Sequence, residues 1–448
     1  MHGLLTDLYE LTMAAGYVAA GKADERATFE LFFRRLPRNR NFVIAAGLAQ
    51  AVDYLLSVSY SNEEIAYLRT LSQFRNAPEE FWRRLHEFRF TGDVWAVPEG
   101  TPVFPNEPIL TLRAPMLEAQ IPETYLLSMI GFQSMIASKA ARIVESAGGR
   151  SVVEFGTRRA HSPEAGTLAA RAAYIGGCIG SSNTESGYRY GIPVFGTSAH
   201  SWVQSFETEP EAFRRLQELL GPDTVQLIDT FDTLEGARHA AALGRPLWGV
   251  RLDSGNLAVL SRAVRRILND AGLHDARIMA SGDLDEYKIL EMTAANLPID
   301  ALGVGTDLST SSDAPKLGVV YKLVEMRGET GTRYTAKFST DKATFPGPKQ
   351  IFRYAGHDEV GCAWECPSCG SNDAEPAMKP LLRPVVVNGR LVAPLPEPGQ
   401  IRSYAAESLA ALPAMVRSLA QSKTEYRVEY TAELRDLYAK VAAREHHA

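Results

Sequence analysis

Short apolar runs alternate with amphipathic helical patterns through the middle of the chain. Six runs are of strand type and start roughly 20 to 40 residues apart, and helical patterns fill most of the gaps between them. The runs cover residues 151–155, 193–195, 225–228, 247–252, 277–280 and 301–304, and a seventh, glycine-rich run covers 175–179. Strands that alternate with helices form βαβ units and a parallel sheet. The spacing predicts a (β/α) barrel, although it does not exclude a doubly wound sheet.

The two ends of the chain do not show this regular alternation of strand and helix patterns. The first 121 residues mix helical patterns with short strands, which predicts an α+β domain. We place the barrel domain at residues 122–325 and expect residues 326–448 to pack with the N-terminal domain, completing its α+β fold. This last part holds a loop-rich stretch at 340–380 and a helical pattern at 405–422, in which Pro413 predicts a break.

Small and polar residues directly follow the strand-type runs. They are Gly156-Thr157-Arg158, Gly196-Thr197 with His200, Asp229-Thr230, Asp253-Ser254-Gly255, Ser281-Gly282-Asp283 and Gly305-Thr306-Asp307. The active sites of α/β barrels lie at the carboxyl ends of their strands. The sequence therefore predicts an active site built from these loops.

Two of these loops have the composition of phosphate sites. They are Ser281-Gly282-Asp283 and Gly303-Val304-Gly305-Thr306-Asp307, after consecutive strand runs. A phosphate needs converging backbone N–H groups with no Cβ in the way, which glycine provides. Each loop alone could be an ordinary turn between a strand and a helix. Their position after the last strands favours phosphate binding, because barrel phosphate sites favour those strands.

Several side chains at the strand ends have two interpretations each. Arg251 and Asp253 lie on the same side of an extended strand end and form either an anion site with a hydroxyl- or metal-binding carboxylate, or an internal salt bridge. Phe155 with Arg158 and Arg159 suits a planar ring and a phosphate, or is a core ring followed by solvated arginines. His200 is either a catalytic imidazole or a structural one.

Composition narrows the class of protein. Apolar residues make up 45% of the chain, charged residues 22%, and the formal net charge is −6, which is typical of a globular protein and disfavours non-specific nucleic-acid binding. No apolar run reaches the ~18 residues of a membrane span. Residues 1–7 lack the basic and apolar regions of a signal peptide. We therefore expect a cytoplasmic enzyme with no nucleic-acid or membrane partner.

Three of the four cysteines lie close together. Cys362, Cys366 and Cys369 have the tight spacing of half a zinc site within a Cys-rich loop at 357–370. Structural zinc takes four ligands, and His357 could supply the fourth. The alternative is a set of free thiols in a Gly/Pro-rich loop.

Five motifs, taken together, resemble nicotinate phosphoribosyltransferases. They are Leu5-Thr6-Asp7-Leu8-Tyr9-Glu10-Leu11-Thr12-Met13, Glu154-Phe155-Gly156 with Arg158-Arg159-Ala160, Gly196-Thr197 with Ala199-His200-Ser201, Arg251-Leu252-Asp253-Ser254-Gly255 and Gly303-Val304-Gly305-Thr306, in this order. The similarity extends from Leu4 to about Val324, and the C-terminal part matches less specifically. The resemblance implies the irregular barrel of type II phosphoribosyltransferases and a role in NAD salvage.

The resemblance also implies the reaction and its residues. The family makes nicotinate mononucleotide and pyrophosphate from nicotinate and phosphoribosyl pyrophosphate, coupled like a ligase to ATP hydrolysis and using Mg²⁺. It implies catalytic roles for His200, transiently phosphorylated by ATP, and for Asp253, which binds ribose hydroxyls or Mg²⁺. It implies nicotinate contacts from Tyr9, Phe155, Thr197 and Arg251, with Tyr9 supplied by the partner subunit of a dimer. For the phosphoribosyl donor it implies Arg158, Ser281, Gly282, Gly303, Gly305 and Thr306.

Three alternatives to this function stay open at the level of sequence. Nicotinamide phosphoribosyltransferase shares the His-Ser and Arg-x-Asp-Ser-Gly elements, whereas Thr197-Ser198-Ala199 before His200 resembles the acid-specific branch. Quinolinate phosphoribosyltransferase has a similar barrel but is typically shorter and lacks the ATP-linked histidine. The third alternative is a catalytically silent regulatory protein that binds a phosphoribosyl ligand.

Overall fold

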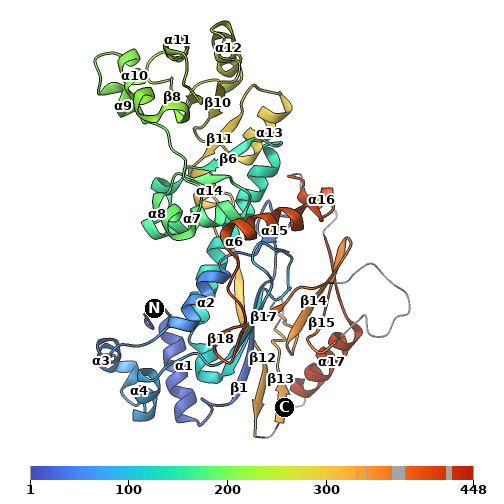
Figure 1. Cartoon of the computed structure of the whole chain (residues 1–448). Helices are drawn as coiled ribbons and strands as arrows, with labels where there is room; N and C mark the ends of the chain where they lie inside the picture. Colours follow the sequence, from blue (N-terminus) through green and yellow to red (C-terminus); the bar gives the residue numbers. More distant parts are fainter. Residues whose placement is uncertain (1, 330, 340–341, 366–378, 420–425, 447–448) are drawn as a thin grey trace.

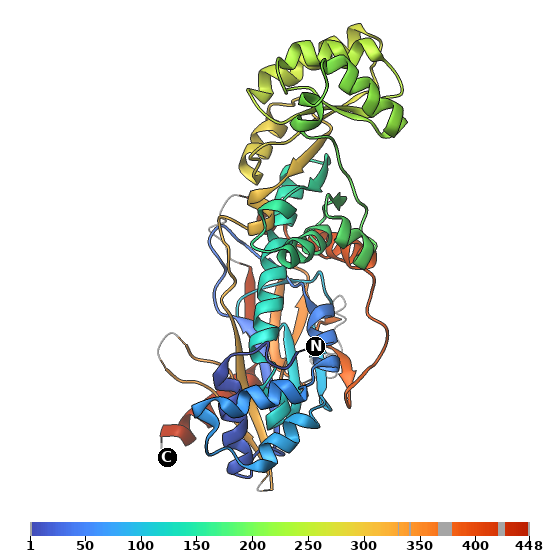
Figure 2. The same ribbon diagram turned by 90° about the vertical axis from the view of Figure 1, so that its left-hand side faces the viewer.

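Two large sheets organise the chain, one toward each end of an elongated molecule (Figure 1, Figure 2). The computed structural model describes residues 2–329, 331–339, 342–365, 379–419 and 426–446. In the N-terminal part it has α1 (Leu8–Ala19), β1 (Arg26–Phe33), β2 (Val43–Ile44), α2 (Leu48–Ser57), α3 (Asn62–Thr70), α4 (Glu79–His86), β3 (Asp93–Ala96), β4 (Pro102–Val103), β5 (Leu110–Pro115) and α5 (Met116–Gln120).

The barrel part follows in the expected alternation. It has α6 (Glu123–Ser146), β6 (Ser151–Glu154), the short 3₁₀ helix η2 (Thr157–Arg159), α7 (Pro163–Ile175), β7 (Gly180–Ser181), α8 (Thr184–Tyr190), α9 (His200–Gln204), α10 (Glu209–Leu220), β8 (Val225–Leu227), α11 (Thr233–Leu243), β9 (Gly249–Leu252), α12 (Leu257–Asp270), β10 (Arg277–Ala280), α13 (Glu286–Ala294), β11 (Ala301–Val304) and α14 (Thr306–Thr310).

The C-terminal part adds mainly strands. It has β12 (Val319–Gly328), β13 (Gly331–Tyr334), β14 (Lys349–Tyr354), β15 (His357–Cys362), β16 (Lys379–Pro380), β17 (Arg383–Val387), β18 (Arg390–Leu391), α15 (Pro398–Ala410), α16 (Ala414–Arg417), β19 (Arg427–Tyr430) and α17 (Ala432–His446). The break between α15 and α16 falls at Pro413, as its missing N–H predicts. The strands β14 and β15 lie within the stretch that the sequence predicts to be mostly loop.

The barrel strands form one parallel sheet in the order β7-β6-β11-β10-β9-β8. This confirms the α/β fold class with its barrel-like parallel sheet. Two strand predictions are wrong. Residues 193–195 make only an isolated bridge between Val194 and Ser181, and the run at 175–179 precedes the actual strand, β7. Among the described residues no ladder joins the segment around Val194 to β8, so the ring of strands is irregular at this point.

The second sheet is antiparallel and draws on both ends of the chain. Its order is β13-β12-β1-β5-β3-β17-β18, and β1 lies between β12 and β5. Phe29, Leu31 and Phe33 alternate along β1 and are buried in the same core, which is the period of two that the sequence shows. The predicted domain boundary at residue 325 is wrong, because it falls inside β12 and the whole of that strand belongs to this sheet.

The long helix α6 connects the two sheets (Figure 1). Its apolar residues divide between two cores: Ile136 and Ile143 pack with the barrel, whereas Leu126 and Ile130 pack with the antiparallel sheet. Its position therefore fixes the barrel relative to the rest of the molecule. None of the helices in the described ranges is both long and apolar enough to cross a membrane.

A small sheet in the order β16-β14-β15-β19 packs against the N-terminal part through a buried carboxyl pair. Arg353 on β14 contacts Asp358 on β15 at 2.6 Å and the Pro102 carbonyl at 2.8 Å. Glu107 is fully buried beside Asp358. Burial, and then the charge of Asp358, raise the pKa of Glu107 well above its ordinary value. Native Glu107 therefore carries a proton under conditions where the unfolded chain has lost it.

We predict that Glu107→Gln stabilises the fold at neutral and higher pH. An unfolded glutamate loses its proton near about pH 4.3, so the stability linked to Glu107 is full below that pH and is lost as the pH rises toward the native pKa. The amide is neutral at every pH, and each unit of pKa difference that it removes is worth about 1.4 kcal/mol. Urea unfolding should show a larger gain at pH 8 than at pH 5. An equal gain at both pH values, or a loss at pH 8, would contradict this; Glu291→Gln, on an exposed side chain of α13, is the matched control.

Candidate functional site

Two adjoining cavities open at the carboxyl ends of the barrel strands. Their volumes are about 560 Å³ and 260 Å³, and Phe155, Arg158, Arg251 and Asp253 line both. The larger is also lined by Thr197 and His200, and the smaller by Ser281, Gly282, Gly303, Gly305 and Thr306. The fold thus gathers every predicted site residue of the barrel around one continuous space.

Arg251, the third residue of β9, is held on three sides. Its Nε donates to Ser281 Oγ at 2.8 Å, its Nη1 to Thr197 Oγ1 at 2.8 Å and its Nη2 to Asp253 Oδ1 at 2.6 Å. The guanidinium carbon lies 5.7 Å from the centre of the Phe155 ring. Nη1 also donates to the Ser198 carbonyl at 3.5 Å. The guanidinium group is therefore fixed beside an aromatic ring, and one of its five N–H groups is left for a ligand.

The two carboxylate oxygens of Asp253 have different roles. Oδ1 is the partner of Arg251, and Oδ2 faces the cavity. Its Oδ1 also accepts a hydrogen bond from Ser281 Oγ at 2.5 Å, while its Oδ2 lies 4.0 Å from His200 Nε2. Burial alone would raise the pKa of Asp253, but the Ser281 hydrogen bond and the charge of Arg251 outweigh burial and lower it. The group is thus ionised at neutral pH. The salt bridge between Arg251 and Asp253 is present and lines the cavity, and ligand binding by the pair stays a prediction.

His200 is the first residue of α9, a short helix that the sequence patterns do not predict. Its Nδ1 lies 3.1 Å from Thr230 Oγ1, and its ring is half-buried. Thr230 follows β8 and is outside the predicted set of site residues. The imidazole is therefore held at one nitrogen while the other faces Asp253 and the larger cavity.

Two glycines are required for the shape of the smaller cavity. Gly282 has φ +89°, and a Cβ there would overlap the carbonyl oxygen of Asp253. A Cβ on Gly303 would lie 2.6 Å from the Phe155 ring. Larger residues would push the turn away from the strand end or displace the ring. The absence of side chains leaves room for a ligand's phosphate against the backbone.

The charge around the cavities is positive overall. Arg158, Arg159 and Arg251 line them, against Asp253 and Asp283. Arg158 and Arg159 lie on η2 and are exposed. Within the described residues, neither forms an ion pair with an acidic side chain. Such a surplus favours a ligand that carries several negative charges.

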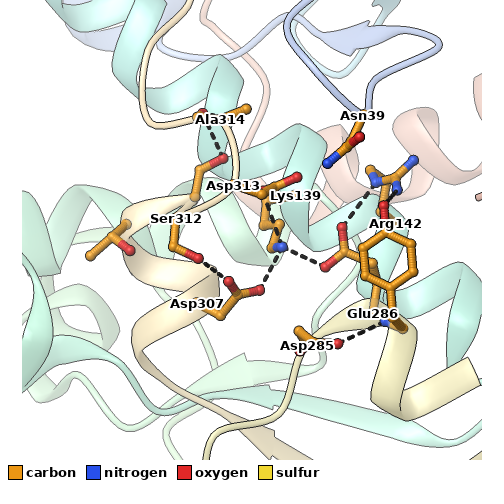
Figure 3. Close-up of polar contacts among 12 residues, drawn as sticks. Asn39, Lys139, Arg142, Asp285, Glu286, Asp307, Ser312, Asp313 and Ala314 are labelled. Atoms are coloured by element: carbon orange, nitrogen blue, oxygen red, sulfur yellow. Dashed lines mark hydrogen bonds and ion pairs between the residues drawn. The ribbon is translucent and has the colours of Figure 1, made fainter.

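An ion network around the buried Lys139 joins α6, α13 and α14 (Figure 3). Lys139 on α6 contacts Glu286 of α13, Asp307 of α14 at 2.5 Å and Asp313 at 3.2 Å. Arg40 binds Asp313 at 2.7 Å, and Arg142 binds Glu286 at 3.1 Å. Asp307 directly follows Thr306 of the predicted phosphate turn. The network thus ties that turn to α6 and to the N-terminal part.

The sequence assigns no individual role to four residues of the site and its support. They are Asp229, Thr230, Asp283 and Lys139. Asp283 stands inside a motif that the sequence does single out, and Asp229-Thr230 follows a strand run. Lys139 lies within a helical pattern and carries no local signal.

Tyr9 does not join the site of its own chain. It lies on α1, in the antiparallel part of the molecule, and is not among the residues that line the two cavities (Figure 1). Its side chain is 44% exposed, and Leu5, Leu8 and Met13 beside it are exposed too. This placement leaves Tyr9 available to another copy of the chain.

One part of the zinc prediction is wrong. His357 and Cys362 are the first and last residues of β15, so their Cα atoms lie about 16 Å apart and cannot bind one ion. Burial, and then Glu365, raise the pKa of Cys362 to about 12, which favours the thiol. Cys366 and Cys369 lie outside the described residues. A zinc site made by the three cysteines stays a prediction.

The glycine turns, the arginine and the aromatic ring at the barrel mouth belong to a fold that solved structures share. The fold matches human nicotinic acid phosphoribosyltransferase with a TM-score of 0.84 and 29% identity, covering 97% of this chain and 99% of that one. It matches nicotinate-nucleotide pyrophosphorylase from Pyrococcus furiosus with a TM-score of 0.74 and 28% identity, covering 91% and 95%. The fold is that of the barrel phosphoribosyltransferases.

Sequence comparisons identify the family. The nicotinate phosphoribosyltransferase N-terminal domain matches residues 4–131, the quinolinate phosphoribosyl transferase C-terminal domain residues 136–314, and the nicotinate phosphoribosyltransferase C-terminal domain residues 373–438. Nicotinate phosphoribosyltransferase pncB2 of Mycobacterium tuberculosis is 45% identical over 95% of this chain and 90% of its own length. The Bacillus subtilis nicotinate phosphoribosyltransferase is 42% identical over 78% and 72%. The chain belongs to the nicotinate phosphoribosyltransferase family, which disfavours the nicotinamide-specific and silent alternatives.

Proposed function

We propose that this chain transfers the phosphoribosyl group of phosphoribosyl pyrophosphate to the ring nitrogen of nicotinate, and so forms nicotinate mononucleotide and pyrophosphate in NAD salvage. The observation that carries this proposal is the guanidinium group of Arg251, fixed 5.7 Å from the Phe155 ring at the barrel mouth. A ring that stacks on Phe155 would present a 3-carboxylate to Arg251. The cation favours the acid over the neutral amide.

The phosphoribosyl donor would occupy the smaller cavity. Arg158 and Arg159 would hold its charged groups, and the backbone at Gly282, Gly305 and Thr306 would receive the 5′-phosphate. Ser281 and Gly303 line the same space. This placement brings the ribose C1 between the two cavities, next to the ring of a stacked nicotinate.

Two aspartates fit a magnesium ion. Asp229 Oδ1 is buried and has no hydrogen-bond partner in the described structure, while Asp253 Oδ2 faces the cavity. Mg²⁺ prefers carboxylate and phosphate oxygens and takes few protein ligands. Bound there with the donor, it would neutralise charge on the departing pyrophosphate. The residues' own part is to align ring nitrogen and ribose and to keep competing water out.

His200 would couple the reaction to ATP by accepting a phosphoryl group. An imidazole is nucleophilic when neutral, and its phosphoramidate is labile enough to be hydrolysed in each cycle. The partial exposure of the His200 ring and its place on the larger cavity support this role. The expected cytoplasmic location accords with these substrates and stays a prediction.

The active unit would be a homodimer. Exposed apolar residues Leu5, Leu8, Tyr9 and Met13 follow one another on and before α1, away from the barrel mouth of the same chain. Tyr9 would close the nicotinate subsite of the partner by stacking on the face of the ring opposite Phe155. An exposed apolar patch of this kind is typical of an interface.

We expect Arg251→Ala to weaken nicotinate binding selectively. Loss of a charge-assisted hydrogen bond should raise the KM for nicotinate about 10- to 100-fold, with a smaller effect on the KM for the donor. Steady-state kinetics with each substrate varied in turn measures both values. Arg158→Ala is the matched control and should show the reverse pattern. Equal losses for both substrates in Arg251→Ala would refute the assigned role.

We expect His200→Ala to separate synthesis from ATP use. The variant should form no acid-labile phosphoprotein from ATP labelled at the γ-phosphate, and ATP should no longer stimulate nucleotide formation, because the acceptor nitrogen is gone. Binding of the donor, measured by calorimetry, checks that the barrel is intact. ATP stimulation that persists in His200→Ala would show that coupling runs through another group.

A further inference from the structure

A third cavity, of about 380 Å³, lies between the antiparallel sheet and the small sheet. Trp95 of β3, Arg113 of β5 and Arg327 of β12 line it from the antiparallel sheet, and Lys349 of β14 and Trp364 line it from the small sheet and the residues that follow β15. It has no described residue in common with the two cavities of the barrel mouth. β12 and β14 lie in the part of the molecule remote from β8 and the barrel (Figure 1). The cavity is therefore separate from the candidate active site.

The charge of this cavity is positive. The described residues that line it include Arg113, Arg327 and Lys349 but no carboxylate. Lys349 is compensated by the buried Glu30, whose Oε2 lies 2.7 Å from Nζ. Arg327 is compensated by the buried Glu325, to which it donates from Nε at 3.2 Å and from Nη2 at 3.4 Å. Arg113 is left without an acidic hydrogen-bond partner in the part of the chain that the structure describes.

The guanidinium group of Arg113 is half-buried and has hydrogen-bond donors to spare. Its Nε donates to Thr28 Oγ1 at 3.2 Å, and within the described ranges its Nη1 and Nη2 make no hydrogen bond. Nη2 lies 3.7 Å from Glu325 Oε1, which already accepts two other hydrogen bonds. Burial lowers the pKa of Arg113, while Asp93 and Arg26, which do not line the cavity, act on it with opposite signs. Such an undercompensated cation favours an anionic ligand.

The aromatic walls of the cavity suit a flat ring. Trp95 and Trp364 both line it, and Trp364 is 48% exposed. The guanidinium carbon of Arg113 lies 5.2 Å from the centre of the Trp95 ring, so the cation and an aromatic surface adjoin. Aromatic side chains stack on any nucleobase, because every base has a π-face. The volume of about 380 Å³ is near the lower end for small-molecule sites, which fits one nucleotide better than a dinucleotide.

We propose that this cavity is a binding site for a nucleoside monophosphate, with the phosphate on Arg113 and Arg327 and the base against Trp95 and Trp364. The phosphate would accept hydrogen bonds from the unused Nη groups and balance the charge of Arg113. Stacking on indole is open to every base, so the site selects for a base joined to a phosphate and not for one particular base. The site is independent of the phosphoribosyl transfer proposed for the barrel mouth.

The first test locates the ligand by fluorine NMR of the full chain labelled with fluorotryptophan. Trp95→Phe and Trp364→Phe assign the two cavity signals. We expect AMP to shift both signals and to leave that of Trp82, on α4, unmoved. Ribose 5-phosphate, which lacks the base, and adenosine, which lacks the phosphate, should each bind about tenfold more weakly or worse. Equal affinity for AMP and either fragment overturns the ligand class, and unmoved cavity signals at millimolar AMP overturn the site.

The second test repeats the AMP titration in charge variants. Arg113→Gln and Arg327→Gln each remove one cation and should weaken AMP binding about tenfold, because a charge-assisted hydrogen bond is lost. Arg266→Gln, on an exposed side chain of α12, is the matched control and should leave AMP binding unchanged. An unchanged Trp82 signal shows that a variant is folded. Wild-type affinity for AMP in Arg113→Gln, or in Arg327→Gln should Arg113→Gln fail to fold, overturns the proposal.

Discussion

The buried ammonium group of Lys139 is the contact on which the arrangement of the site depends. Its side chain is 1% exposed and meets Glu286, Asp307 and Asp313, which come from three different places in the barrel sequence. An unpaired charge in such a place would cost several kcal/mol, so neither the cation nor its partners can move independently. Because Lys139 belongs to the helix that packs on both sheets, the network ties the glycine turns of the smaller cavity to the rest of the molecule (Figure 3).

Charge compensation also holds the residues at the barrel mouth, but there the charged groups remain accessible from the cavity. Arg251 and Asp253 compensate each other's charge, but both keep an atom directed at the cavity. The remaining positive charge comes from the arginines of η2, which are exposed. In the proposed function the ring subsite would be fixed by its contacts, while the donor subsite would combine glycine turns with exposed cations. This division suits a reaction in which a flat acid must be aligned and a highly charged pyrophosphate must leave.

The local sequence pattern predicts most of the strands, helices and polar loops, but few of the contacts between residues that are far apart in the sequence. The parallel strands and the polar loops after them follow from period and turn residues, because burial in a parallel sheet demands apolar runs with small residues at their ends. The segment around Val194 fails as a strand because only a single bridge holds it, a matter of tertiary pairing. Lys139 and Thr230 look ordinary in sequence, since their importance lies in partners far along the chain. His357 and Cys362 show the converse, as neighbours in sequence that an extended strand keeps apart.

The most direct test of the account is product formation by the wild-type protein with phosphoribosyl pyrophosphate and either nicotinate or nicotinamide at equal concentration. The geometry of Arg251 and Phe155 predicts nicotinate mononucleotide, with turnover of nicotinamide lower by about a hundredfold or more, because the amide lacks the charge that the guanidinium binds. Preference for nicotinamide would contradict the role given to Arg251. Turnover of neither base would contradict the assignment of the barrel mouth as a phosphoribosyltransferase site.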